Sequence, residues 1–393
     1  MKKLSNFVNG KSVDSTSGET TTLVNPATGQ PFATAPNSNA ADIDAAYKAA
    51  NDAFPDWRDS TPSQRQRALL KIADAIEERA EEIIAIECEN TGKPISLTTS
   101  EEVPPMVDQI RFFAGAARNL EGKSAGEYMP GMTSMIRREP VGVIGQVTPW
   151  NYPMMMAVWK WAPAIAAGNT VVLKPSDTTP ASTVWMANLM AEFLPAGVFN
   201  VVCGERETGA TLVNHARPDM VAITGSVAAG IKVAESAAKQ LKRVHLELGG
   251  KAPVVVFADA DLAAAAEAIA VAGYFNAGQD CTAATRVIVQ DSVYDQFVAL
   301  ITEQAKQIAI GAPADEDVFL GPVNNVNQLA RITDLLSRVP AHAQVMTGGS
   351  ALDRPGFFFP ATVVAGLHQS DELIQKEIFG PVITVQKFTD EAQ

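Results

Sequence analysis

A single cysteine in the segment Phe275 to Thr282, FNAGQDCT, is the strongest chemical signal in this sequence. Cys281 follows an alanine-rich helical stretch and a Gly-Gln pair, and it lies 34 positions beyond Glu247. Thiols are strong nucleophiles even when only a few per cent are ionised, and a loop at a helix end lets the sulfur reach a substrate. We therefore predict that Cys281 is a covalent nucleophile. The competing interpretation is an apolar filler, because free cysteine is among the most buried residue types.

The other two cysteines have the surroundings of buried residues. Cys88 lies in an amphipathic helical pattern, and Cys203 ends the apolar run VFNVVC. Three cysteines without paired spacing in a long acidic chain argue against a disulfide framework and against a zinc site. We expect a reducing compartment and no metal.

Composition limits the classes of partner. The chain has 393 residues, of which 47% are hydrophobic, and its formal net charge is -13. Such a chain buries a sizeable core in two or more lobes, and its charge disfavours nucleic acid and anionic membranes as partners. No apolar run reaches the length of a membrane span, and Met1 to Gly10 lacks the apolar centre of a signal peptide. The expectation is a cytoplasmic protein with no membrane and no nucleic-acid partner.

The elements that must position Cys281 and Glu247 follow from the pattern of strands and helices. Thr61 and Pro62 are typical of an N-cap and a first helical position, and apolar residues then recur at helical spacing until a stop near Thr91. From residue 141 onward, short β-branched runs alternate with helical stretches. The runs are VGVIGQVTP, NTVVLKP, FNVVCG, MVAITGS, RVHLELGG and KAPVVVF. This alternation predicts an α/β fold with a doubly wound parallel sheet.

Ligands of such sheets bind outside the carboxyl ends of the strands, so the residues after each strand carry the most weight. Lys174 and Asp177 follow one strand and could hydrogen-bond the adenosine ribose of a dinucleotide; the alternative is a solvated loop. Gly225 and Ser226 open a helix after another strand and could hold a pyrophosphate. The fingerprint GxGxxG is absent, and GSVAAG at residues 225 to 230 is a weak signal by itself.

Five segments in order and spacing resemble the NAD(P)-dependent aldehyde dehydrogenase superfamily, from about Val8 to Gln393. The segments are TPWNYPMMMAVWKWAPAIAAGNTVVLKPSD, ITGSVAAG, LELGGKAPVVVF, FNAGQDCTAATR and EIFGPV. Within the superfamily, the sequence is most similar to γ-aminobutyraldehyde dehydrogenases, with betaine aldehyde dehydrogenases next.

The resemblance implies the roles of three catalytic residues. Cys281 attacks the aldehyde, and the Asn151 amide and the Cys281 backbone N–H hold the oxyanion. Glu247 activates water to hydrolyse the thioester. Without the resemblance, Asn151 would be interpreted as a turn residue and Glu247 as a buried structural carboxylate.

The resemblance also implies the cofactor contacts, which are Thr148, Pro149, Trp150, Lys174, Ser176, Asp177, Gly204, Gly225, Ser226, Leu248, Glu377 and Phe379. Many NAD-preferring members carry glutamate where Asp177 stands. A shorter carboxylate still repels a 2'-phosphate, so we predict NAD as the cofactor, with NADP possible.

For the substrate, carboxylates and aromatic faces suit a cationic amino-aldehyde such as 4-aminobutanal. The candidate residues are Glu102, Tyr152, Trp159, Phe275 and Asp280. Core packing is the alternative for the aromatic residues, and a solvated helix end is the alternative for Glu102. Other hypotheses are a betaine aldehyde or ω-aminoaldehyde dehydrogenase and a catalytically impaired nucleotide-binding fragment.

The expected organisation is an NAD-binding domain at 1–123 and 141–248, an oligomerisation hairpin at 124–140, and a catalytic α/β domain at 249–393. Members of the superfamily usually continue for several tens of residues beyond the segment that resembles Phe379 to Gln393. The catalytic domain is therefore expected to be incomplete and this chain to be poorly active. The full-length parent is expected to be a homo-oligomer, a dimer or tetramer.

Overall fold

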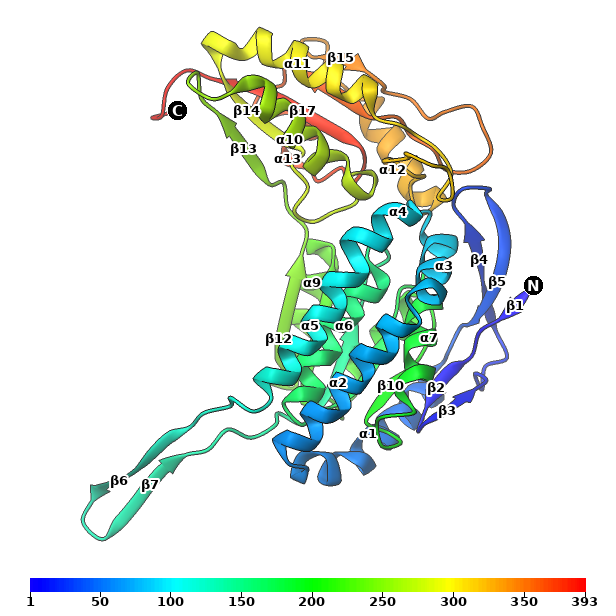
Figure 1. Ribbon diagram of the computed structural model, residues 1–393, viewed down its shortest axis with the longest axis vertical. Helices are drawn as coiled ribbons and strands as arrows, with labels where there is room; N and C mark the ends of the chain where they lie inside the picture. Colours follow the sequence, from blue (N-terminus) through cyan, green and yellow to red (C-terminus); the bar gives the residue numbers. More distant parts are fainter. The chain divides into compact units, whose positions relative to one another are not determined.

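The computed structural model describes residues 1–393, which divide into two compact units (Figure 1). The first unit comprises Met1–Leu23, Ala33–Ile86 and Thr99–Glu247, and the second comprises Val24–Phe32, Glu87–Thr98 and Leu248–Gln393. Two short segments that we expected in the first domain thus group with the second unit. Long-range hydrogen bonds explain this: Phe357 N donates to Pro26 O over 2.9 Å, and Ile95 N donates to Pro313 O over 2.9 Å.

The first unit contains a seven-stranded sheet with the order β12-β11-β8-β9-β10-β2-β3. Strands β11, β8, β9 and β10 are parallel, while β2 is antiparallel to both β10 and β3. The strands are β2 (Asn6–Val8), β3 (Lys11–Val13), β8 (Val143–Val147), β9 (Thr170–Lys174), β10 (Phe199–Val201), β11 (Met220–Gly225) and β12 (Arg243–Leu248).

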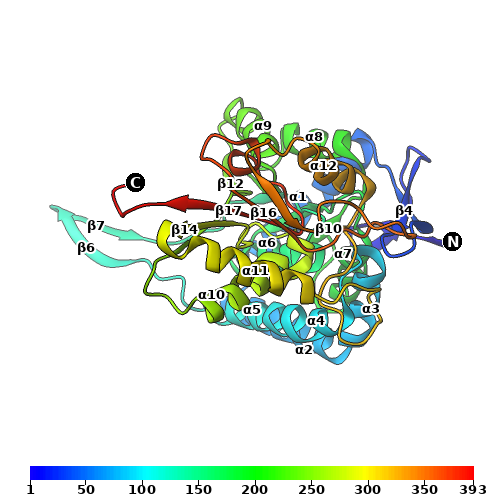
Figure 2. The same cartoon turned by 90° about the horizontal axis from the view of Figure 1, so that it is seen from above.

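Helices cover both faces of this sheet, as Figures 1 and 2 show. One face packs against α1 (Ala40–Asp59), α8 (Arg206–Asn214) and α9 (Val227–Ala238). The other face packs against α6 (Pro153–Ala166) and α7 (Ala181–Met190), which are backed by α2 (Pro62–Glu78) and α5 (Val103–Ala116). Neighbouring strand residues such as Val171 and Val172 are both fully buried because each face is covered. This arrangement confirms the expected doubly wound α/β class.

The helix that begins after Thr61 is shorter than expected. The Thr61 hydroxyl accepts from Gln64 N and the Gln64 side chain accepts from Thr61 N, which forms a capping box. The single helix that we expected to reach Thr91 ends at Glu78, because Arg79 leaves helical geometry with φ −110° and ψ 28°. A second helix, α3 (Ala80–Thr91), follows directly. The apolar spacing continues across the break, so periodicity alone does not reveal it.

Shorter elements complete the first half of the chain. They are β1 (Lys2–Lys3), β4 (Thr20–Asn25) and β5 (Gln30–Pro36), which form a sheet in the order β1-β5-β4, the helix α4 (Ile95–Leu97), and the π-helix η1 (Thr98–Glu102). A two-stranded hairpin, β6 (Lys123–Met129) and β7 (Met132–Ile136), extends away from the helices of the first unit (Figure 1). Its large apolar side chains are exposed, among them Tyr128 and Met135.

The second unit has a five-stranded sheet with the order β13-β14-β17-β16-β15, parallel except for β15. The strands are β13 (Pro253–Val256), β14 (Arg286–Gln290), β15 (Gln344–Thr347), β16 (Thr362–Ala365) and β17 (Val382–Phe388). Helices α10 (Leu262–Tyr274) and α11 (Tyr294–Gln307) pack on one face. Helices α12 (Val326–Leu336) and α13 (Glu372–Gln375) pack on the other face over β16 and β17. The 3₁₀ turns η2 (Phe275–Gly278) and η3 (Asp291–Val293) follow α10 and β14.

No helix in the structure combines the length and the apolar character that crossing a membrane requires.

Candidate active site

The topology of the first unit predicts a crevice for a ligand at the ends of β8 and β11. From β8 the chain proceeds through β9 and β10 on one side, then returns to place β11 on the other side of β8. Helices that follow two such strands diverge, and ligands bind where the strand order reverses. Residues Thr148 to Asn151 follow β8, and Ser226 follows β11, so both predicted segments lie at this switch point.

Ser226 is the N-cap of α9. Its hydroxyl accepts from Ala229 N over 3.2 Å, and the twelve-residue helix that follows directs its N-terminal amides outward. Ser226 is exposed, and a Cβ on Gly225 would make only ordinary van der Waals contacts, the nearest with Ile223 at 3.6 Å. Helix N-termini attract anions through their unpaired N–H groups and the helix dipole. This end of α9 therefore has the features of a phosphate site.

Lys174 ends β9 and is buried. Its Nζ donates to Pro175 O over 2.7 Å and to Gly204 O over 2.6 Å, and burial lowers the pKa of the ammonium group. The solvated-loop alternative is therefore wrong for Lys174. The adjacent Ser176 Oγ donates to Asp177 Oδ1 over 3.1 Å, and the charge of Asp177 acts to raise the pKa of Lys174.

Thr148 has a buried hydroxyl that no protein group satisfies. Its backbone N donates to Lys174 O over 3.1 Å, whereas Oγ1 has no hydrogen-bond partner. A buried polar atom without a partner costs free energy unless a ligand or a water satisfies it. The hydroxyl thus fits a bound polar ligand in the crevice after β8. Pro149 and Trp150 follow in the same bend and are partly buried.

Asn151 and Tyr152 are buried at the start of α6, 6% and 8% exposed. Tyr152 is the N-cap position of α6, and Pro153 occupies its first turn. Asn151 therefore sits beside a helix N-terminus, where an oxyanion is electrostatically favoured.

Glu247 lies near the end of the edge strand β12 with its side chain 53% exposed, and it is 3.5 Å from His245 Nε2. The interpretation of Glu247 as a buried structural carboxylate is therefore wrong.

Lys160, on α6, is a buried group of the first unit that the sequence did not indicate. Burial lowers the pKa of Lys160 to about 8, although the charge of Glu247 acts in the opposite direction.

The buried ammonium of Lys160 has a measurable consequence for stability. Its folded pKa lies below the unfolded value, so the unfolded chain binds more protons, and stability rises with pH between about 8 and 10.5. Lys160→Met is expected to raise the free energy of unfolding at pH 7 by about 3 kcal/mol, and this gain should vanish by about pH 10.5. Denaturant unfolding of the wild type and of Lys160→Met between pH 7 and about pH 10.5 measures this gain. Lys71→Met, which removes an exposed lysine from α2, is the control. A gain independent of pH would contradict this explanation.

In the second unit, Cys281 follows a turn in left-handed backbone geometry. Asn276, Ala277 and Gly278 have φ values of 49°, 55° and 66°. Non-glycine residues rarely adopt such values, and they persist where surrounding contacts enforce them. The buried Gln279 supplies these contacts, because its Nε2 donates to Asn276 O over 3.0 Å and its Oε1 accepts from Asn324 N over 2.9 Å. The turn thus holds the exposed Cys281 at a defined place.

The cysteine loop packs against the loop of Glu377 and Phe379. A Cβ on Gly278 would overlap the carbonyl of Gly380, so only glycine allows this approach. Phe379 also has positive φ, 60°, and its carbonyl accepts from Gln328 Nε2 over 2.7 Å. The second unit therefore brings Cys281 and two of the predicted cofactor residues, Glu377 and Phe379, onto adjoining loops.

Glu377 faces the Gly249–Gly250 segment directly after Leu248. Gly250 N donates to Glu377 Oε1 over 3.2 Å, and a Cβ on Gly249 would collide with this carboxylate. Burial raises the pKa of Glu377. Lys251, which the sequence analysis also missed, has a buried Nζ without a hydrogen-bond partner, and burial lowers its pKa to about 8.

The predicted substrate residues differ in their surroundings. In the first unit, Glu102 is 3% exposed at the end of η1, so the solvated-helix-end alternative is wrong, and Trp159 is 43% exposed on α6, so core packing does not explain it. In the second unit, Phe275 contacts Phe319 edge to face. Asp280 Oδ1 accepts from Thr282 N and Thr282 Oγ1, both over 2.7 Å, which orients the turn around Cys281.

The other two cysteines are buried, so their thiols cannot reach a substrate. Cys88 and Cys203 are 2% and 1% exposed, and burial raises the pKa of Cys203 to about 12. Cys281 is therefore the thiol with access to a ligand.

Comparison with known proteins identifies the family of the chain. The model of the aldehyde dehydrogenase family matches residues 12–393. An NAD-dependent aldehyde dehydrogenase from Sinorhizobium meliloti is similar at 37% identity and a TM-score of 0.96, over 99% of this chain and 79% of that chain. The NAD+ complex of an aldehyde dehydrogenase from Bacillus cereus shares 34% identity, with a TM-score of 0.96 over 100% of this chain and 80% of that one.

A betaine aldehyde dehydrogenase mutant from Staphylococcus aureus, in complex with NAD+, shares 34% identity, with a TM-score of 0.96 over 100% of this chain and 82% of that chain. This chain belongs to the aldehyde dehydrogenase family.

Proposed function

We propose that this protein oxidises an aldehyde to a carboxylate with NAD as the cofactor and Cys281 as the nucleophile. The observation that carries the proposal is the accessible thiol of Cys281 on a turn that Gln279 holds in place, in a chain whose other two thiols are buried. When bound, NAD would supply the acceptor for the hydride that leaves the substrate carbon.

The described residues fit NAD. The N-terminus of α9 with Ser226 suits the pyrophosphate, and the polar side chains of Lys174, Ser176 and Asp177 after β9 suit the adenosine ribose. The unsatisfied hydroxyl of Thr148 supplies a further hydrogen bond in the same crevice. We assign Pro149, Trp150, Gly204, Leu248, Glu377 and Phe379 to the same cofactor.

The proposed reaction has two halves. The Cys281 thiolate adds to the aldehyde carbon, and the Asn151 amide and the Cys281 N–H stabilise the oxyanion, each worth about 3 to 4 kcal/mol of barrier. After hydride loss from this carbon, the thioester remains on Cys281. Glu247 then removes a proton from the attacking water, and hydrolysis releases the carboxylic acid and restores the thiol.

The hairpin formed by β6 and β7 has two unpaired strand edges and exposed apolar side chains, which favour association with another chain. A two-stranded ribbon with exposed apolar side chains is at best marginally stable in water by itself. We propose that a second copy of the chain covers it.

For the substrate, we propose a cationic amino-aldehyde, of which 4-aminobutanal is the first candidate and betaine aldehyde the second. The exposed indole of Trp159 offers a face to an ammonium group. Asp280 adds a carboxylate next to the nucleophile, because it is one residue from Cys281.

The experiment compares 4-aminobutanal, betaine aldehyde and hexanal with the wild-type chain and Asp280→Asn. An asparagine oxygen still accepts from Thr282 N, so this variant removes the charge and keeps the turn. We expect KM for 4-aminobutanal to rise about tenfold, because one attractive charge is lost, with hexanal little affected. Equal effects on both aldehydes would contradict the amino-aldehyde proposal, whereas continued oxidation of hexanal would leave the dehydrogenase function intact.

A further inference from the structure

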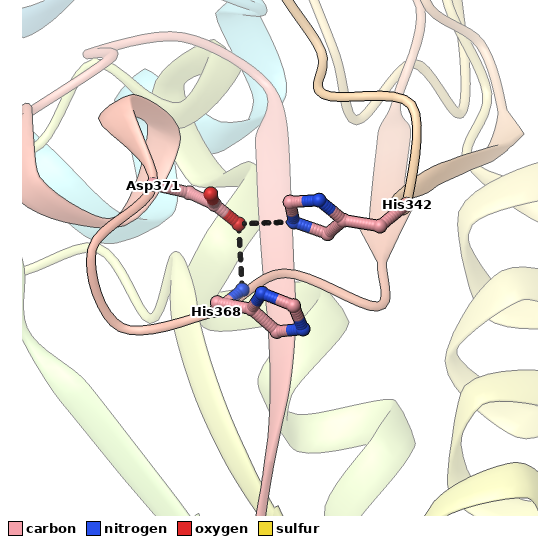
Figure 3. A group of neighbouring side chains, drawn as sticks. All are labelled: His342, His368 and Asp371. Atoms are coloured by element: carbon pink, nitrogen blue, oxygen red, sulfur yellow. Dashed lines mark hydrogen bonds and ion pairs between the residues drawn. The ribbon is translucent and has the colours of Figure 1, made fainter.

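Three side chains that are able to bind a metal meet in the second unit, away from the Cys281 loop in the sequence. They are His342, His368 and Asp371, and their ligating atoms lie within 4.8 Å of one another (Figure 3). His342 precedes β15, His368 follows β16, and Asp371 is the N-cap of α13. The fold thus brings together three ligands from two separate loops.

The backbone around these ligands is held by hydrogen bonds. Asp371 N donates to His368 O over 3.0 Å, and His368 N donates to Asp371 Oδ2 over 2.6 Å. Ahead of β15, Ala343 N donates to Pro340 O over 2.9 Å. A binding site whose loops are already ordered loses little conformational entropy when a ligand enters.

The carboxylate and the imidazoles keep donor atoms for a cation. The His342 Nε2 and the His368 N both contact Asp371 Oδ2, as Figure 3 shows, while Oδ1 takes part in neither contact. The two imidazole rings are stacked, with centroids 4.1 Å apart and planes 10° apart.

An ordinary ion pair does not account for this arrangement. An ion pair with Asp371 requires only one histidine, and it does not explain why a second imidazole lies beside the first. The carboxylate of Glu372, next to Asp371 in the sequence, is paired with Arg338 and Lys376, so the cluster consists of two imidazoles and one carboxylate. These ligand types suit Zn²⁺ and the neighbouring divalent transition metals.

Of the three ligands, His368 borders a recess whose lining does not include His342 or Asp371. His368 lines an open recess of about 1170 Å³ together with Gly366, Leu367 and Gln369. Neighbouring ligand atoms around a tetrahedral zinc ion lie about 3.3 Å apart, so side-chain rotation is enough to close the present spacing.

We propose that His342, His368 and Asp371 bind a divalent transition-metal ion, Zn²⁺ in the first place, with water as the fourth ligand. The ion joins the loop before β15 to the loop between β16 and α13. It thereby stabilises the second unit and takes no part in aldehyde oxidation.

Equilibrium dialysis of the full chain against Zn²⁺ tests this site. The Cys281→Ser background prevents the exposed thiol from binding the metal. We expect one Zn²⁺ per chain, affinity weakened more than about tenfold by either His342→Gln or His368→Gln, and no stoichiometric binding in the double variant. His215→Gln is the matched control, because His215 lies in the first unit and stacks on Tyr47. Circular dichroism verifies that each variant is folded.

A second measurement separates this site from adventitious binding. Co²⁺ bound by the cluster should give the visible spectrum of nitrogen and oxygen ligands, and Zn²⁺ should raise the melting temperature of the Cys281→Ser chain but not of the double variant. Absence of stoichiometric binding, or equal binding by the folded double variant, would overturn the proposal.

Discussion

Cys281→Ser is expected to reduce kcat for aldehyde oxidation by on the order of 10⁴-fold or more while NAD binding stays intact. A serine hydroxyl is almost never ionised at neutral pH, whereas a thiol is ionised to a few per cent, and the thiolate is the far better nucleophile. Serine preserves the size of the side chain and the hydrogen bonds of Asp280 with Thr282, so the turn should keep its geometry. Steady-state production of NADH measures the loss, and fluorescence titration with NAD measures binding.

Cys203→Ser provides the matched control. Cys203 is fully enclosed, and burial keeps its pKa near 12, so it supplies no nucleophile at neutral pH. The variant should retain kcat within a few fold. If Cys281→Ser kept substantial turnover, covalent catalysis through this thiol would be wrong, and a nucleotide-binding role for the chain would gain support.

The doubly wound unit could be predicted from the sequence because its signals are local. Strands β8 to β12 each coincide with a short apolar run of the sequence. The start of α2 is indicated by Thr61, which forms a capping box. The ends of these strands then identify the crevice, since ligand sites in parallel sheets follow from topology. Thr148, Lys174 and Ser226 lie at strand ends for this reason.

The features that the sequence did not predict depend on contacts between residues that are far apart in the chain. Segments 24–32 and 87–98 join the second unit through contacts with residues more than 200 positions away, such as Phe357 and Pro313, which no window of sequence contains. The buried state of Lys160 and Lys251 is missed for a similar reason. Lysine is usually exposed, and only the packing of other elements reveals that these two are enclosed.

The geometry around Cys281 depends both on the local sequence and on contacts with residues that are distant in the sequence. The sequence FNAGQDCT predicts a turn, but not that Asn276 and Ala277 adopt positive φ. That conformation is enforced by Gln279, Asn324 and the approach of Gly278 to Gly380. Strained residues at a loop that carries a nucleophile are consistent with a site selected for geometry at some cost in stability.

Glu247→Gln is expected to separate the two halves of the reaction. The amide keeps the shape of the side chain but is no base, so hydrolysis of the thioester should slow by about 10²- to 10⁴-fold. Acylation and hydride transfer precede this step, so rapid mixing should still show a burst of up to one NADH per active site. Mass spectrometry should then find the acyl group on Cys281.

The position of Glu247 makes this test informative. Its side chain is half exposed at the end of β12, so the neutral substitution should fold normally, although it removes the charge that raises the pKa of the buried Lys160. Glu235→Gln, which alters an exposed carboxylate on α9, should behave like the wild type in burst and turnover. Loss of the burst in Glu247→Gln would place this carboxylate before hydride transfer, as the base that activates Cys281. An unchanged kcat would exclude it from the rate-determining chemistry. Only a retained burst with slow turnover agrees with a base that acts on water after the thioester has formed.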